Sequence, residues 1–272
     1  MTRHFVRRGD SLVGVGEDTP GATVTAFDVC LLDPGDRLPP RVQSFEECVY
    51  LLSGTPVLQM DSTATLLRPG DYGLIPVGTP HAWINEGSEP ARWASMRSPQ
   101  PRARHEYDTY PVSLDAPPPA IPVDPRDPRT RFFGHIELSQ MEVGSVSMAT
   151  ALMVYTGIAV KMMVDSNLGA RLTTMFMVHY DADGAAGAHD HPFEETYLFL
   201  EGEAEAEFDG EIYRLRPGDL AFAGAGCVHG FRNAGGGPLR WLETQAPQPP
   251  SRHSYRFVRD WAHLRSVTGE DA

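Results

Sequence analysis

Four residues in the second half of the chain have side chains that together could bind a metal ion. His189 and His191 are separated by one residue, Glu195 follows four residues later, and His229 lies farther along the chain. Because side chains alternate across a strand, residues 189, 191 and 195 could all face one side of a β structure. Three neutral imidazoles and one carboxylate would suit a divalent Mn, Fe, Co, Ni, Cu or Zn ion, whereas calcium and magnesium prefer more oxygen ligands. The residue types do not specify which of these ions is bound.

The surrounding sequence has the pattern of short β-strands. Apolar and polar residues alternate over residues 203–208, and Asp209-Gly210, a strong hairpin signal, follows directly. The 26 glycines and 24 prolines among 272 residues also favour many short strands over long helices. These features predict an all-β protein built as an antiparallel barrel or sandwich.

The second half of the chain repeats the first at an offset of 148 residues. Phe-Glu-Glu at 45–47 recurs at 193–195, and Leu-Arg-Pro-Gly-Asp at 67–71 recurs at 215–219. A proline-dense segment at 115–129, which can form neither a helix nor a central strand, separates the two copies. We therefore expect an N-terminal barrel at 1–114, a linker at 115–129 and a C-terminal barrel at 130–272. A short C-terminal helix is expected around residues 258–265.

Two motifs in the second half resemble the paired motifs of the cupin superfamily. The first spans residues 184–202 and the second spans residues 218–233. They depart from the family pattern at two turn positions: the first glycine is one residue nearer the histidine, and Gly224 stands where proline is usual. In that family, the two histidines and the glutamate of the first motif and the histidine of the second bind a divalent metal inside the barrel. The resemblance implies four metal ligands here: His189, His191, Glu195 and His229.

The resemblance also implies an architecture of two tandem antiparallel double-stranded β-helix barrels, a bicupin. The ligand set is similar to that of quercetinase-like bicupins. The chain length, with a single metal in the C-terminal half, is similar to that of ureidoglycine aminohydrolase-like bicupins, which place glutamate, histidine, histidine and glutamine at the ligand positions. This second likeness therefore concerns the architecture and does not indicate the substrate.

The first half of the chain does not retain the four candidate ligands. The repeat places Arg41, Gln43, Glu47 and His81 at the matching positions. Arginine remains protonated and cannot ligate a metal. We expect the Arg41 cation to fill the space of the metal and to pair with Glu47, which would otherwise be an uncompensated buried carboxylate. The alternative is a metal site with two or three ligands from Gln43, Glu47 and His81.

Three aromatic residues near the candidate ligands could form the wall of a substrate pocket. Tyr197, Phe199 and Phe231 share parity with neighbouring ligands, although residues that pack the core would show the same pattern. The motif contains no dedicated base. Glu195, if it can dissociate from the metal, is the candidate catalytic residue for accepting a substrate proton.

Three functional classes are compatible with this site. Four protein ligands on a six-coordinate ion would leave two positions for a substrate, or for a substrate oxygen beside water or dioxygen. The favoured hypothesis is a dioxygenase-type oxidoreductase that acts on a small anionic or enolisable organic substrate. The alternatives are a non-redox hydrolase, decarboxylase or isomerase at the same metal, and a non-enzymatic cupin that binds a small molecule.

The composition excludes several other classes of partner. The formal net charge is −13 and the basic residues are scattered, so neither nucleic acid nor an anionic membrane surface is an expected partner. The N-terminal residues lack the apolar run of a signal peptide, which predicts a cytoplasmic protein. Cys30, Cys48 and Cys227 are far apart and are expected to be reduced. The expected ligands are a small-molecule substrate and a divalent metal, with no organic cofactor; a homodimer is left open.

Overall fold

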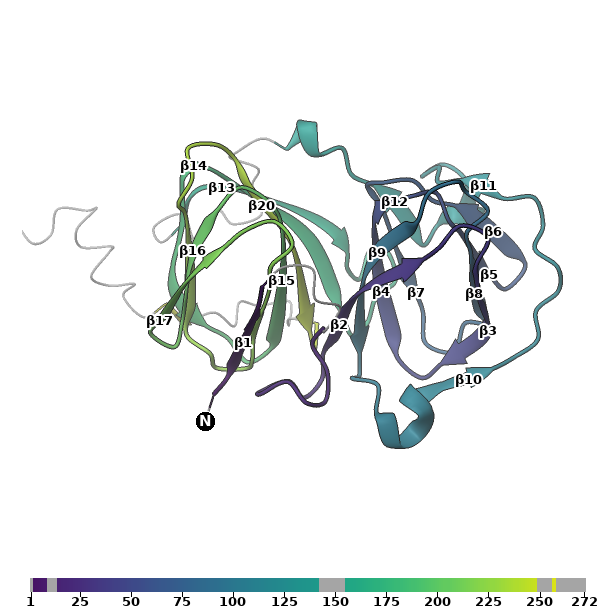
Figure 1. Cartoon of the computed structure of the whole chain (residues 1–272), viewed down its shortest axis with the longest axis horizontal. Helices are drawn as coiled ribbons and strands as arrows, with labels where there is room; N and C mark the ends of the chain where they lie inside the picture. The colour runs from purple at the N-terminus through teal and green to yellow at the C-terminus, as the bar shows by residue number, and fades with distance from the viewer. Residues whose placement is uncertain (1, 9–13, 142–154, 249–255, 258–272) are drawn as a thin grey trace, which may run out of the picture.

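The computed structural model describes residues 2–8, 14–141, 155–248 and 256–257 of the chain. Two β-barrels lie side by side (Figure 1), which confirms the predicted all-β fold with two tandem barrels. The helical elements of the described residues are three short 3-10 turns, η1 (Ala103–Asp108), η2 (Pro128–Thr130) and η3 (Leu138–Gln140). The helix expected around residues 258–265 lies outside the described residues.

The first barrel is formed by two sheets. Its strands are β2 (Ala26–Leu32), β3 (Arg37–Gln43), β4 (Glu46–Ser53), β5 (Val57–Met60), β6 (Thr63–Leu66), β7 (Asp71–Ile75), β8 (His81–Ile84), β9 (Ala91–Ser98), β10 (Thr109–Pro111), β11 (Ile121–Pro122) and β12 (Phe133–His135). One sheet has the order β10-β3-β8-β5-β6-β11 and the other has the order β12-β7-β4-β9-β2. Part of the proline-dense segment thus joins the barrel, because β11 pairs in parallel with β6.

The second barrel is a single ten-stranded sheet. Its strands are β1 (His4–Arg7), β13 (Tyr155–Val164), β14 (Thr174–Asp190), β15 (Glu194–Glu201), β16 (Ala204–Phe208), β17 (Glu211–Leu215), β18 (Leu220–Ala223), β19 (His229–Asn233), β20 (Leu239–Ala246) and β21 (Arg256–Phe257). The order is β1-β18-β15-β20-β14-β19-β16-β17, and β13 and β21 both pair with β14.

The strands follow the sequence repeat. β4 and β15 have bounds 148 residues apart, as do β9 and β20. The long β14 covers the positions of β2 and of all but the last residue of β3. The predicted hairpin joins β16 to β17 around Asp209 and Gly210, whose φ angles are 49° and 88°. Positive φ at both turn residues is the geometry of a type I′ turn, which matches the twist of the flanking strands.

Two short strands cross the division expected from the sequence. β1, which precedes the first barrel, pairs with β18 of the second barrel. β12, which follows the proline-dense segment, pairs with β7 of the first barrel. Because β7 and β18 occupy equivalent positions in the repeat, the exchange is reciprocal. The division into residues 1–114, 115–129 and 130–272 stays a prediction from the sequence.

Two buried carboxylates connect the barrels in the same reciprocal way. Glu46 of the first barrel accepts hydrogen bonds of 2.9, 3.2 and 3.0 Å from the backbone N–H groups of residues 171–173, and one of 2.5 Å from the Thr173 hydroxyl. Its repeat equivalent, Glu194, accepts from the backbone N–H groups of residues 23–25, the shortest bond being 2.7 Å. The side chains are 3% and 2% exposed. Each barrel therefore binds the segment that leads into the other.

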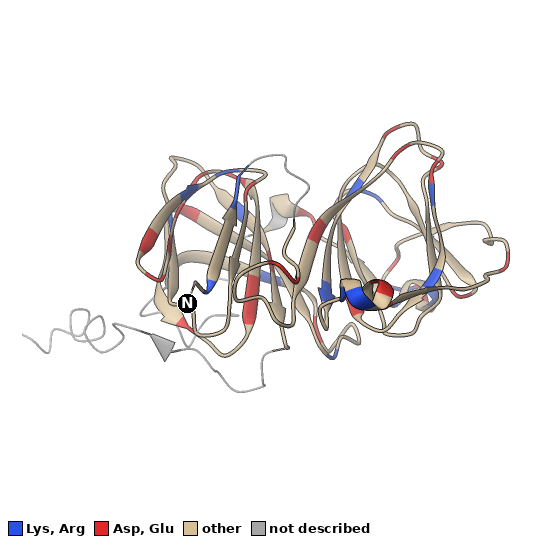
Figure 2. Ribbon diagram, turned by 60° about the horizontal axis from the view of Figure 1, so that its bottom comes forward, with Lys and Arg blue, Asp and Glu red and all other residues tan. Residues whose placement is uncertain are grey.

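Apolar side chains from both halves fill the space between the barrels. Phe27, Cys48 and Leu74 belong to one buried cluster with Met175 and Phe222 of the second half. Each barrel has, in addition, a core of its own. Acidic and basic positions are interspersed over both barrels (Figure 2). No helix among the described residues has the length and apolarity needed to cross a bilayer.

We expect Glu194→Ala to lower the free energy of unfolding by about 3 kcal/mol, because several buried backbone donors would lose a charged acceptor. The matched control is Glu207→Ala, which removes an exposed glutamate from β16 and should change stability by less than about 0.5 kcal/mol. Urea-induced unfolding followed by circular dichroism measures both values. A Glu194 variant as stable as the control would show that this carboxylate does not hold the barrels together.

Candidate metal centre

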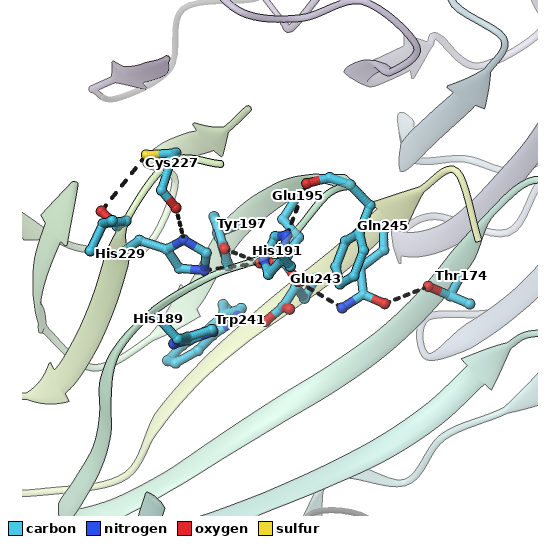
Figure 3. A network of polar contacts seen from close by, with 12 residues as sticks. Thr174, His189, His191, Glu195, Tyr197, Cys227, His229, Trp241, Glu243 and Gln245 are labelled. Atoms are coloured by element: carbon cyan, nitrogen blue, oxygen red, sulfur yellow. Dashed lines mark hydrogen bonds and ion pairs between the residues drawn. The ribbon is translucent and has the colours of Figure 1, made fainter. Parts of the chain in front are cut away.

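The four candidate ligands meet inside the second barrel. His189 lies near the end of β14, His191 directly follows that strand, Glu195 is the second residue of β15 and His229 begins β19. His189 and His229 are directly paired across neighbouring strands. All four side chains are 5% exposed or less. Figure 3 shows that they point toward one another from these elements.

Backbone carbonyl groups orient the three imidazole rings. In each ring Nδ1 lies within 2.9 Å of the carbonyl oxygen of a residue two positions away; the pairs are His189 with Gly187, His191 with Phe193, and His229 with Cys227. A carbonyl oxygen can only accept, so Nδ1 carries the proton in each ring. The lone pair of each neutral ring is therefore on Nε2, as in a metal-ligating histidine.

Glu195 lies at the centre of this group. Its Oε2 atom is 2.9 Å from His191 Nε2 and 3.2 Å from His229 Nε2. The Tyr197 hydroxyl also donates to Oε2. On the other side Gln245 Nε2 donates to Oε1 over 2.7 Å, and Gln245 is itself held by the Thr174 hydroxyl over 3.0 Å. The carboxylate is thus fixed in one position by groups from three strands.

The electrostatics of the site favour an ionised carboxylate and act differently on two of its imidazoles. Burial alone would lower the pKa of His191, but the neighbouring Glu195 raises it above its ordinary value. Burial, followed by the nearby His229, lowers the pKa of His189 to about 3, so this ring is neutral near pH 7. Burial alone would raise the pKa of Glu195, but His191 and His229 hold it well below its ordinary value. Burial and the neighbouring Glu195 raise the pKa of Tyr197, which keeps its hydroxyl a hydrogen-bond donor.

This donor set fits a divalent transition metal. One ligand atom from each of His189, His191 and His229 lies within 4.8 Å of the others, and the Glu195 carboxylate already contacts two of the rings. Nitrogen-rich donors with one carboxylate suit Mn, Fe, Co, Ni, Cu or Zn better than Ca or Mg.

A cavity of about 140 Å³ lies beside the candidate ligands. His189, Glu195 and His229 line it, together with Tyr197 and Phe231, two of the three aromatic residues that the sequence suggested. Phe199 is not part of the lining. Its ring lies 5.5 Å from that of Trp241, which does line the cavity.

Three lining residues that the sequence did not suggest lie on β20. Trp241, Glu243 and Gln245 alternate along this strand and face the cavity. Trp241 Nε1 donates to a Glu243 oxygen over 2.8 Å. Burial and the charge of Glu195 raise the pKa of Glu243 well above its ordinary value. The repeat contains a signal for two of these residues, because Glu243 and Gln245 replace Ser95 and Arg97 of the first half.

The first barrel has a different polar cluster at the equivalent place. Gln43 Nε2 donates to Glu47 over 3.0 Å and the Ser95 hydroxyl donates to the other Glu47 oxygen over 2.6 Å. Arg41 Nε donates to His81 Nε2 over 3.3 Å. Both oxygens of Glu47 and Nε2 of His81 are therefore engaged by protein donors.

The described part of the structure does not contain the ion pair that was expected between Arg41 and Glu47. Among the described residues the Glu47 carboxylate is satisfied by an amide and a hydroxyl, and the half-buried Arg41 contacts His81 instead. Neutral donors are sufficient because each offers a short hydrogen bond to the buried oxygens. The sequence could not indicate Ser95, which approaches Glu47 from β9.

A second group of metal-binding residue types does not include the candidate ligands. His4, Asp209 and Cys227 have ligand atoms within 4.8 Å of one another. Arg3 binds both Asp209 oxygens, over 2.7 and 3.1 Å, and burial followed by the charge of Asp209 raises the pKa of Cys227 to about 12. An occupied carboxylate and a neutral thiol make this group a poor metal site. All three cysteines are free, as predicted.

Comparison with known proteins agrees with this architecture. The model of the cupin domain family matches residues 28–97 and 176–244, one match in each barrel and about half of the chain in total. The chain belongs to the cupin family. It is therefore a bicupin, and both matched regions include the strand that carries the glutamate of the metal motif.

Individual proteins similar to this bicupin in sequence or in fold include dioxygenases and a decarboxylase. A quercetin 2,3-dioxygenase of Bacillus subtilis (strain 168) is 26% identical over 240 residues, which cover 78% of this chain and 71% of that protein. The structure of a salicylate 1,2-dioxygenase from Pseudaminobacter salicylatoxidans has a TM-score of 0.65 at 14% identity, covering 94% of this chain and 78% of that one. An oxalate decarboxylase from Lactobacillus farciminis has a TM-score of 0.64 at 14% identity, covering 94% and 87%. The two structural likenesses concern the fold.

We expect about one transition-metal ion per chain in the purified bicupin. His191→Ala should lower the occupancy on the order of tenfold, because it removes a ligand. Gln43→Ala, the same repeat position in the first barrel, is the matched control and should leave the metal content unchanged. Elemental analysis of dialysed protein measures the content. Two ions per chain, or loss of metal only in the Gln43 variant, would contradict a single centre in the second barrel.

We expect Ser95→Val to destabilise the protein more than Arg41→Met. The valine would leave a buried Glu47 oxygen without its donor, at a cost of about 2 kcal/mol. Loss of the half-buried Arg41 contact should cost less than about 1 kcal/mol. Urea unfolding compares the two, and both variants should keep their metal. A larger cost for Arg41→Met would favour charge compensation of Glu47 by the arginine.

Proposed function

We propose that this bicupin is a metal-dependent dioxygenase that acts on a small organic substrate in its second barrel. The proposed ligands of the metal are His189, His191, Glu195 and His229. The observation that carries the proposal is a buried set of three imidazoles and one carboxylate beside a largely apolar cavity. The 26% identity to a protein named as a quercetin 2,3-dioxygenase supports the same reaction class.

The charge of the ligand set selects the substrate. A divalent ion held there would bind substrate oxygens as a Lewis acid and, if redox-active, as iron and manganese are, would supply dioxygen chemistry. Three neutral rings and one carboxylate leave a formal charge of +1 on such a centre. It should therefore attract an anionic or enolisable oxygen donor. On a six-coordinate ion, two positions remain for such a donor and a second small molecule.

The protein groups around the cavity bind and orient that donor. Apolar side chains of β13 and β14, with Phe231 and Trp241, surround the organic part of the substrate and exclude water. Glu195, if it leaves the ion, is the proposed acceptor of the substrate proton. Glu243 is a second carboxyl group on the cavity wall, and Trp241 fixes its orientation.

Two other functions would use the same site differently. A non-redox hydrolase, decarboxylase or isomerase would polarise a carbonyl or activate water and would not need dioxygen. A binding protein would hold the ligand without turnover. The oxalate decarboxylase fold neighbour supports the first alternative only at the level of architecture.

The proposal also concerns the setting of the reaction. Three free cysteines support a reducing compartment and hence a cytoplasmic location. The first barrel is proposed to act as a scaffold, because Arg41 and Gln43 replace two of the imidazoles of the second barrel. A homodimer is compatible with this arrangement and is not required by it.

We expect substrate turnover to be accompanied by oxygen uptake of about one O₂ per substrate, the stoichiometry of a dioxygenase. The assay incubates the metal-loaded protein with a panel of small enolisable and anionic oxygen compounds while an electrode follows oxygen. Under strict anaerobiosis turnover should stop. Equal turnover without oxygen would exclude the dioxygenase and favour the non-redox alternative.

His229→Ala should lower this activity at least about 100-fold by removing a metal ligand. The matched control is His81→Ala, the same repeat position in the first barrel, which should keep the metal and most of the activity. Full loss of activity in the control, with its metal retained, would contradict the assignment of the reaction to the second barrel alone.

A further inference from the structure

The free space beside the metal ligands is small. The cavity holds about 140 Å³. An apolar protein cavity of roughly 150 Å³ accommodates one benzene molecule. The space that the wall surrounds is therefore about the size of a single six-membered ring, and the ligands His189, Glu195 and His229 form one part of that wall.

The aromatic part of the wall is held in place by its own contacts. The Phe231 ring lies 4.8 Å from that of Tyr197 and 5.1 Å from that of Trp241, and Trp241 lies 4.6 Å from Tyr180. All four side chains are 5% exposed or less. The Tyr197 hydroxyl is fixed on Glu195 and the Trp241 indole on Glu243. Because packed interiors resist changes in volume, these rings cannot withdraw to admit a larger molecule at low cost.

The first barrel has a larger side chain at the position equivalent to Phe231. This residue is Trp83, whose ring stacks on Trp93 with centroids 4.2 Å apart and planes within 14°. In the second barrel the smaller Phe231 lies 5.1 Å from Trp241 at an angle of 35°. The same barrel position is thus occupied by a larger ring in the half without the metal ligands and by a smaller ring in the half with them.

Polar groups are concentrated near the ligands. Apart from those ligands and the Tyr180 and Tyr197 hydroxyls, the polar lining residues are Glu243 and Gln245. Gln245 already donates to Glu195 and accepts from Thr174. The rest of the lining is largely apolar and includes Ile158 and Val178. A bound molecule should therefore carry its oxygens at one end and an apolar body at the other.

We propose that the substrate of this site is a single-ring or similarly small chelating oxygen compound, and that Phe231 excludes multi-ring compounds. The inference rests on the proposed function, because the metal must hold the oxygens. The proposed substrate is smaller than quercetin, for which the relative is named, since a three-ring flavonol needs more space than one ring. The specificity arises from the clash of the additional rings with a fixed wall.

The test measures binding to zinc-loaded protein, because zinc is redox-inert and no turnover occurs. The probes are 1,2-dihydroxybenzene and 3-hydroxyflavone, which both offer two adjacent oxygens, and calorimetry gives their dissociation constants. We expect the single-ring probe to bind at least about tenfold more tightly than the flavonol. Phe231→Leu should reduce the difference between the two dissociation constants, because the smaller side chain admits the larger probe.

Phe231→Trp introduces the residue that the first barrel uses. It should weaken binding of the single-ring probe at least about tenfold while the zinc content stays the same. Trp83→Phe, the reciprocal change in the first barrel, is the matched control and should change neither dissociation constant. The thermal unfolding of each variant reports on its folding.

The outcomes separate the size of the substrate from the reaction. A flavonol that binds wild-type protein as tightly as the single-ring probe would overturn the size inference and leave the proposed metal centre intact. Zinc-loaded protein that binds neither probe, or Phe231→Trp protein that binds the single-ring probe unchanged, would overturn it as well. Failure to load zinc, or turnover without oxygen uptake, would instead contradict the proposed function.

Discussion

The reciprocal binding of Glu46 and Glu194 to the backbone of the opposite barrel is the constraint on which the rest of the structure depends. Each carboxylate is adjacent in sequence to the glutamate that faces its own barrel interior, Glu47 or Glu195. Since neighbouring side chains of a strand point to opposite faces, one glutamate connects the barrels and the next reaches the functional site. The Phe-Glu-Glu motif thus couples assembly to chemistry on a single strand.

A chain of contacts extends this coupling to the candidate ligands. Glu46 of the first barrel binds the Thr173 backbone and hydroxyl, and the next residue, Thr174, holds Gln245. Gln245 in turn donates to Glu195. The first barrel, which lacks the donor set of the second, therefore still fixes the position of a ligand. The first barrel thus has a structural role, because it supports the other barrel.

The sequence predicted what depends on local pattern and repeat. Alternation along strands placed His189, His191 and Glu195 on one face, the resemblance to the cupin motifs added His229, and the offset of 148 residues predicted two barrels. It did not predict that Ser95 rather than Arg41 satisfies Glu47, because that contact joins strands far apart in the chain. Glu243 was missed for a similar reason: only comparison with Ser95 at the equivalent position marks it as a residue that differs between the halves.

The exchange of β1 and β12 also affects how the chain folds. β1 is near the beginning of the chain but pairs with β18, which is synthesised late, so contacts between very distant residues complete the second barrel. Closing such a long loop costs chain entropy and slows folding. The edge of β18 stays unpaired until β1 docks, and an unpaired edge can capture the same strand from another molecule. By pairing with β18 within the same molecule, the amino-terminal strand therefore disfavours domain-swapped association.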